Sequence, residues 1–144
     1  MGKKRIVKKS GGSVNKGLRS RALGNSPKRK MLSGILYVQA TYNNTKVQLT
    51  DGEGNAVMWS SSGALGFAGA KKGTPFAAAK VGELIAEKAQ TMGLKSVHAI
   101  IKGVGAGRES ALRAFAGKGI DITSISDQTP VPFNGPRQRR PRRV

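Results

Sequence analysis

Charge is distributed very unevenly along this chain, and this limits which part of it can fold. All seven acidic residues lie between Asp51 and Asp127, whereas residues 1–30 contain eleven lysines and arginines and residues 137–144 contain five arginines. Most of the net charge of +19 therefore lies at two ends that have few apolar residues. Such segments repel themselves and stay unfolded until a polyanion neutralises them. We expect a folded middle, two basic arms and a nucleic-acid partner.

Composition argues against several other classes of protein. The chain has no cysteine, so it can form neither disulfides nor thiolate metal sites. Its longest apolar run, residues 35–38, is far shorter than the roughly 18–20 residues of a membrane span. The basic N-terminus lacks the apolar stretch of a secretory signal, although a transit peptide has a similar composition. With a single histidine and no carboxylate pair at metal-binding spacing, we expect no enzyme, no cofactor and no metal.

Residue periodicity in the middle of the chain predicts one α/β (α+β) domain over residues 31–128. Strands are expected at 34–40, 46–50, 56–59, 97–102 and 120–125, and helices at 74–92 and 109–116. Thr74 is the expected N-cap of the first helix, and Lys88 is expected away from its buried face. The strand–helix–strand end implies a right-handed crossover between parallel strands.

The predicted architecture is therefore a mixed five-stranded sheet, with three antiparallel strands followed by strand–helix–strand, packed with two helices. This topology is ribonuclease-H-like. Nucleases of that topology need a metal-binding aspartate in the first strand, and residues 34–41 contain no acid. We therefore expect the topology without its catalytic acids.

Both ends are predicted to be arms rather than domains. Residues 1–30 form a basic N-terminal arm, disordered or ordered by RNA, in which glycines such as Gly17 and Gly24 should break any helix. Residues 129–144 form an extended, RNA-binding tail, because four prolines prevent it from joining a sheet.

A glycine-rich turn at 103–108, GVGAGR, joins a predicted strand to a predicted helix. Glycines allow close backbone approach, a helix N-terminus offers unpaired N–H groups, and Arg108 adds a cation, so we favour contact with a nucleic-acid phosphate. The alternatives are a tight packing turn, or a free nucleotide. The third glycine of a dinucleotide site and the lysine of a P-loop are both missing.

Residues 59–73 form the other candidate segment. Three serine hydroxyls, a pair of lysines beside a helix start and an exposed Phe67 would suit phosphate, ribose and base contacts. The alternative is a surface loop whose Phe67 returns to the core. Residues 43–45, NNT, could be an ordinary turn. Trp59 is expected in the core, and His98 in a structural or solvated role.

Four blocks together resemble the small-subunit ribosomal protein family S-eleven (uS-eleven), of bacterial or organellar type. They are NNTKVQLTDGEGNAVMWSSSG (43–63), GFAGAKKGTPFAAA (66–79), KGVGAGRESALRA (102–114) and DQTPVPFNGPRQRRPRRV (127–144). The resemblance implies a structural, cytoplasmic constituent of the ribosome, with an organellar ribosome as an alternative. Such a protein bridges helices of ribosomal RNA on the platform and helps to form the cleft for the Shine–Dalgarno helix of the messenger RNA. Implied neighbours are the small-subunit proteins numbered seven and eighteen, with initiation factor three nearby.

The resemblance also implies which residues contact RNA. Carried over by motif, these are Asn43, Asn44, Thr45, Ser60, Ser61, Ser62, Gly63, Phe67, Lys71, Lys72, Thr74, Gly105, Gly107, Arg108, Asn134, Gly135, Arg137, Arg139, Arg140, Arg142 and Arg143. The chain departs from the family pattern at Ala68, Phe133 and Pro136, which puts contacts specific to those side chains in doubt. The competing interpretation is an architectural nucleic-acid-binding protein that recognises charge alone.

Overall fold

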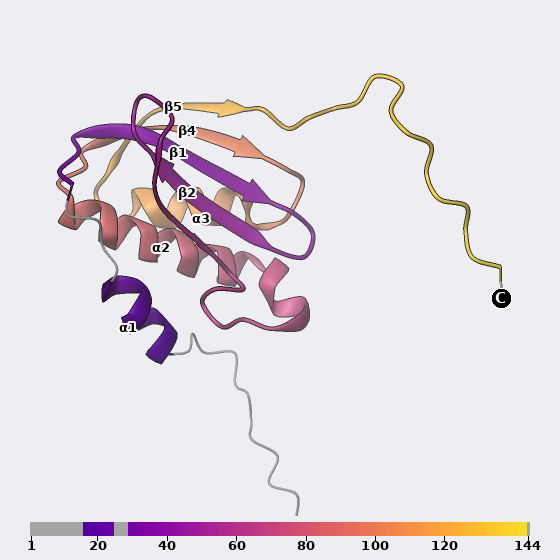
Figure 1. Ribbon diagram of the computed structural model, residues 1–144, viewed down its shortest axis with the longest axis horizontal. Coiled ribbons are helices and arrows are strands. Elements are labelled where there is room, and N and C mark those ends of the chain that lie inside the picture. Colours follow the sequence, from indigo (N-terminus) through magenta and orange to yellow (C-terminus); the bar gives the residue numbers. More distant parts are fainter. Residues whose placement is uncertain (1–15, 25–28, 144) are drawn as a thin grey trace, which may run out of the picture.

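A computed structural model of the chain describes residues 16–24 and 29–143. In these ranges the chain forms a five-stranded mixed sheet with the strand order β3-β2-β1-β4-β5, which confirms the predicted α/β class and topology (Figure 1). The elements in chain order are α1 (Lys16–Gly24), β1 (Ser33–Ala40), β2 (Thr45–Thr50), β3 (Ala56–Ser61), the 3-10 helix η1 (Gly69–Gly73), α2 (Pro75–Thr91), β4 (Ser96–Lys102), α3 (Gly107–Ala116) and β5 (Asp121–Asp127).

The handedness of two connections decides which face of the sheet is covered. Strands β1, β4 and β5 pair in parallel, whereas β2 pairs antiparallel with both β1 and β3. Helix α2 joins β3 to β4 and helix α3 joins β4 to β5, so both connections cross the sheet in the same direction. Because such crossovers are right-handed, they place their helices on the same face. Helices α2 and α3 therefore pack side by side on one face and leave the other open (Figure 1).

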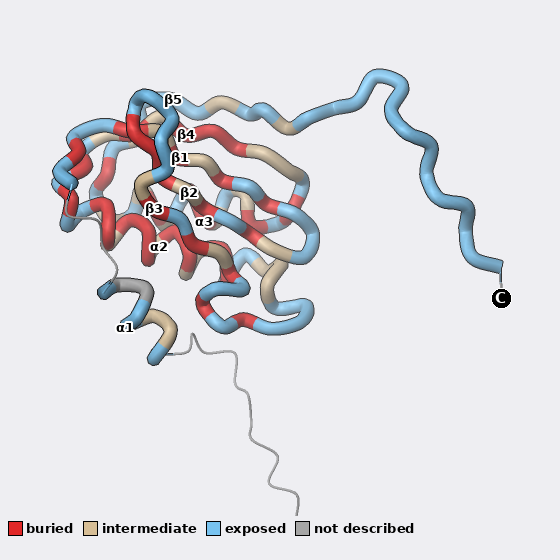
Figure 2. The backbone as a smooth tube through the Cα atoms, viewed as in Figure 1, coloured by how far each residue is buried: buried red, intermediate tan, exposed pale blue. Residues whose placement is uncertain are grey.

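The core lies between the sheet and these two helices. Leu36 and Leu49 face each other across β1 and β2 and are fully buried, as are Leu84 and Ile85 of α2 and Phe115 of α3. Truncating a buried phenylalanine to alanine costs about 3–5 kcal/mol, so Phe115 alone accounts for a large part of the stability of the domain. Figure 2 shows this burial along α2 and the central strands, and an exposed chain beyond β5.

Helix α2 begins as predicted. The Thr74 hydroxyl accepts a hydrogen bond from the Ala77 N–H at 3.3 Å, and Pro75 occupies the first helical position. After the helix, Gly93 adopts a φ of 80°, which favours glycine. One expectation is wrong: Lys88 is buried beside Met58 and Ser60, and this burial lowers the pKa of its amine.

The N-terminal arm contains a helix that the sequence did not predict. The expectation for residues 1–15 and 25–28 lies outside the described residues, but residues 16–24 form α1. Its glycines, Gly17 and Gly24, sit in the first turn and at the last position, where they interrupt little of the helix. Arg19 ties α1 to α2 through an ion pair with Glu87 at 2.9 Å. Burial alone would raise the pKa of Glu87, but hydrogen bonds from Arg19 and Lys118 hold it below its usual value.

Candidate nucleic-acid interface

The loops that the sequence singled out meet at one edge of the sheet. Parallel strands end on the same side, so the segments that follow β1, β4 and β5 lie together. Strand β2 starts there and β3 ends there, which adds the segment leading into α2. We call this set of segments, residues 41–44, 62–74, 103–106 and 128–143, the loop edge. In Figure 1 it lies where the arrows of β1 and β4 point and where the tail departs.

The turn between β1 and β2 closes on itself through Thr41. The Thr41 hydroxyl accepts a hydrogen bond from the Asn44 N–H at 3.1 Å, and the Thr41 N–H donates to the Asn44 carbonyl at 2.8 Å. This pattern leaves Tyr42 and Asn43 fully at the surface and Asn44 half-buried. Asn43 can therefore present its amide outward, as expected of a polar contact.

Ser62 connects this turn to the segment that precedes α2. Its hydroxyl lies 2.6 Å from the Asn44 side-chain oxygen and 2.7 Å from the Lys72 carbonyl, and it accepts from the Thr45 N–H at 3.2 Å. A hydroxyl carries one hydrogen, so it donates to one of the first two at a time. Thr45, Ser60 and Ser62 are all buried, which corrects the expectation that their side chains contact RNA. The Ser62 hydroxyl and the Thr45 N–H are used to hold the two segments together.

Phe67 also has a structural position. It is only 7% exposed, and its ring meets that of Phe76 edge to face, with centroids 6.1 Å apart. The expectation that an exposed Phe67 stacks on a base is therefore wrong, and the core alternative holds. Of the contacts expected in this segment, Gly63 and Lys71 are exposed, and Ser61, Lys72 and Thr74 are partly exposed.

The glycines of the GVGAGR turn are required for packing. A side chain at Gly105 would place its Cβ 2.2 Å from the Thr41 carbonyl oxygen, and one at Gly107 would lie 2.2 Å from the Thr45 hydroxyl. The Gly105 N–H donates to the Ala40 carbonyl at 2.9 Å, so it is not available to a ligand. Gly105 and Gly107 are both buried. The tight-turn alternative therefore accounts for these two glycines, and the expected phosphate contact at their backbone is not supported.

Arg108 joins this turn to the start of the tail. Its guanidinium donates to the Gly103 carbonyl and to the Asp127 carboxylate, and lies 3.3 Å from the Thr129 hydroxyl. Hydrogen bonds from the Thr129 hydroxyl and from Arg108 lower the pKa of Asp127 to about 2. Arg108 is still partly exposed. Its guanidinium could therefore contact a phosphate while it remains paired with Asp127.

The tail beyond Thr129 is exposed throughout its described length and has no regular structure (Figure 2). Asn134 has a φ of 65°, which turns the chain just before Gly135. No buried side chain anchors the expected contacts Asn134, Gly135, Arg137, Arg139, Arg140, Arg142 and Arg143 to the domain.

Charge differs between the loop edge and the opposite edge of the sheet, which we call the far edge (residues 51–55, 92–95 and 117–121). In the described part of the chain, the two acids next to the loop edge, Glu109 and Asp127, are each paired with an arginine. Lys46, Lys72 and Lys102 add positive charge there without such pairs. Residues 16–24 and 29–143 contain no group of three or more His, Cys, Asp or Glu residues able to hold a metal ion. They also contain no helix long and apolar enough to cross a membrane.

Sequence reasoning missed an aromatic residue at the surface. Trp59 was expected in the core, but it is 58% exposed, and the Lys46 amine lies 5.3 Å from its ring centroid. Strand alternation was the available signal. Met58 faces the helices, so its neighbour must face the opposite side of the sheet.

A comparison with protein families gives one match over most of the chain. The family model described as Ribosomal protein S11 matches residues 34–143. The matched span covers the sheet, α2, α3, the loop edge and nearly all of the tail.

Proposed function

The chain belongs to the S-eleven family of ribosomal proteins, and on this premise we propose that its loop edge and tail bridge helices of ribosomal RNA on the platform of the small subunit. Membership itself makes the protein a structural constituent of the small ribosomal subunit that binds ribosomal RNA. The family is structural rather than catalytic.

One observation carries the proposal: four segments far apart in the sequence converge on one edge, where Lys72, Lys102 and the tail arginines have no ion pair within the described chain. Lys72 stands just before the start of α2, Lys102 ends β4, and the arginines of the tail follow β5. Lysine and arginine at helix starts and on extended chain are typical phosphate contacts. A rigid edge with a long exposed tail can touch one RNA helix with the loops and a second with the tail.

The buried polar residues have a defined part in this proposal. Asn44, Thr45 and Ser62 hold the β1–β2 turn against the segment before α2. Asn43, Ser61, Gly63, Lys71, Lys72 and Thr74 are then the groups that reach RNA at the loop edge. Because binding does not have to order these loops, less conformational entropy is lost on contact.

The finer assignments follow from the family resemblance. We propose that the tail lies beside the cleft that holds the Shine–Dalgarno helix of the messenger RNA, and that the protein takes part in subunit assembly. Neighbours would be the small-subunit proteins numbered seven and eighteen, with initiation factor three binding nearby.

Sedimentation at high salt tests the proposal. A lysate is separated on a sucrose gradient containing magnesium and about 0.5 M salt, where exposed charges are screened to a few ångströms. We expect stoichiometric retention on the small subunit, followed by crosslinks from Lys72 and the tail arginines to platform RNA. Release to the top of the gradient, together with equal affinity for random duplex DNA, would instead favour the architectural, charge-only binder.

A further inference from the structure

The face of the sheet opposite α2 and α3 carries a row of side chains that the loop-edge function does not use. Strand register places Trp59, Gln48, Tyr37 and Ile100 side by side across β3, β2, β1 and β4. The next row, toward the loop edge, consists of Ser61, Lys46, Gln39 and Lys102. These eight residues define what we call the open face.

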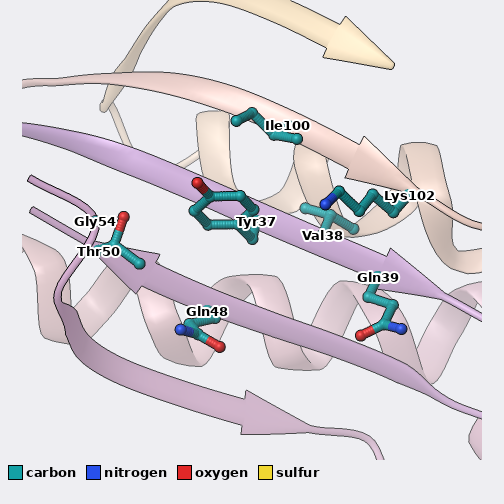
Figure 3. Close-up of a pocket in the computed structure, with 8 residues that line it drawn as sticks. All are labelled: Tyr37, Val38, Gln39, Gln48, Thr50, Gly54, Ile100 and Lys102. Carbon is teal, nitrogen blue, oxygen red and sulfur yellow. The ribbon is translucent and has the colours of Figure 1, made fainter. Parts of the chain in front are cut away.

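A shallow hollow on the open face brings aromatic, amide and cationic groups together. Tyr37 and Ile100 line it along with Gln39, Gln48 and Lys102 (Figure 3). Figure 3 shows the Tyr37 ring between the hairpin residue Gly54 and the Lys102 side chain. Within the described chain, the side-chain amides of Gln39 and Gln48 and the amine of Lys102 have no hydrogen-bond partner. Their hydrogen-bonding capacity is therefore open to a ligand.

From this geometry, and resting on the proposed RNA-binding function, we propose that the open face binds unpaired RNA bases. Sheet faces that present aromatic rings take bases by stacking, and glutamine amides match the donor and acceptor edges of bases. Trp59 and Tyr37 are two strands apart, about 10 Å, which allows one base on each ring. Lys102 lines the hollow beside Tyr37 and can neutralise an adjoining phosphate. The Lys46 amine lies over the Trp59 ring and can do the same once a base displaces it from the ring.

Charge favours RNA over a protein as the occupant. None of the eight residues of the open face is acidic, and its two lysines lie in the row nearest the loop edge. A strand that leaves a helix bound at the loop edge can therefore continue onto the open face without crossing a carboxylate. A duplex cannot use the rings in the same way, because its bases are already stacked on each other.

The single tryptophan of the chain makes the proposal testable on the full-length protein. Trp59 fluorescence is followed while a single-stranded RNA oligomer, and separately a duplex RNA of equal length, is titrated at about 0.3 M salt to weaken purely ionic binding. We expect the single strand to quench Trp59 and the duplex to bind with little quenching. Unchanged Trp59 emission when the single strand is saturating overturns the proposal.

Variants of the hollow separate base stacking from charge. Tyr37→Leu keeps an apolar side chain and is expected to weaken single-strand binding by about tenfold, since stacking contributes strongly per base, while duplex affinity stays unchanged. Gln39→Ala and Gln48→Ala, which remove surface amides, give a second test that does not threaten the fold. Leu32→Ala, at an exposed apolar residue outside both the open face and the loop edge, is the control.

The outcomes distinguish this inference from the function on which it rests. Equal loss of single-strand and duplex affinity in Tyr37→Leu overturns the stacking site. So does normal single-strand affinity in all three hollow variants, while the protein still sediments with the small subunit. Failure to bind either RNA and release from the subunit overturn both proposals.

Discussion

The two edges of the sheet use similar polar residues for opposite purposes. At the far edge, the Asp51 carboxylate accepts hydrogen bonds from the Asn55 and Glu53 N–H groups at 2.9 and 3.1 Å and pairs with Arg29 at 3.4 Å. The Asn55 hydrogen bonds, with smaller help from Glu53 and Arg29, lower the pKa of Asp51 against the effect of its burial. At the loop edge, hydrogen bonds among uncharged groups hold the β1–β2 turn, Arg108 pairs with Asp127, and Lys72 and Lys102 have no ion pair within the described chain. At the far edge the charge of Asp51 is neutralised by Arg29 of the same chain, whereas at the loop edge positive charge remains for RNA to neutralise.

The largest effect should come from removing the most charge at the loop edge. Deleting residues 137–144 is expected to flatten the salt dependence of RNA binding by several units, at about 0.9 per arginine that contacts a duplex phosphate. The fold should survive, because no described residue of this segment is buried. Affinity measured across a salt series, with circular dichroism for the fold, checks both statements. An unfolded truncated protein would contradict the separation of tail from domain.

Packing at the loop edge is expected to be less tolerant than at the far edge. Gly105→Ala would push its Cβ against the Thr41 carbonyl oxygen, and we expect a loss of about 1–3 kcal/mol in the free energy of unfolding, the usual cost of overpacking. The control is Gly52→Ala in the far hairpin, where a Cβ meets nothing within 4 Å. Urea denaturation measures the two variants. Similar stabilities for both would show that the turn at 103–106 can move away.

Single lysines sharpen the comparison of charge. Lys72→Gln at the loop edge is expected to reduce the slope of log affinity against log salt by about one unit. Lys95→Gln, which removes an exposed lysine at the far edge, should leave the slope unchanged. Filter binding with a platform RNA fragment gives both slopes. Equal reductions in the two variants would argue for binding to charge wherever it lies.

The smallest effect concerns the junction of β5 with the tail. Because the pKa of Asp127 is lowered to about 2, its contribution to stability is present above the unfolded pKa of about 4 and is lost as the pH falls through 2. Thr129→Val and Arg108→Met should each raise this pKa, since the Thr129 hydroxyl and the Arg108 guanidinium both donate hydrogen bonds to the carboxylate. Carboxyl NMR titration measures the values, with Asp51 as the far-edge reference. An unchanged pKa of Asp127 in both variants would contradict these contacts.

Local patterns predicted most of the fold, but not which of the proposed site residues are buried. The cap at Thr74, the strands and the five-stranded topology follow from periodicity and turn residues within a few positions of one another. Helix α1 was missed because glycine content was weighed without regard to position, and Gly17 and Gly24 lie at its ends. Thr45, Ser62 and Phe67 were expected to contact RNA from the family resemblance, and Ser62 and Phe67 also because their types suit RNA. Thr45 and Ser62 form hydrogen bonds with residues 10 or more positions away in the sequence, and local patterns cannot reveal such partners.

The sequence by itself determined the uneven distribution of charge, the class of the partner and the order of the five strands with α2 and α3. Charge, alternation and capping are local properties, so they can be recognised without coordinates. Only the tertiary structure decided which polar residues face outward at the loop edge, that Arg108 holds the tail, and that Trp59 and Tyr37 share an open face. Those facts depend on strand register and on two crossovers of the same hand, which bring distant residues together and cover only one side of the sheet.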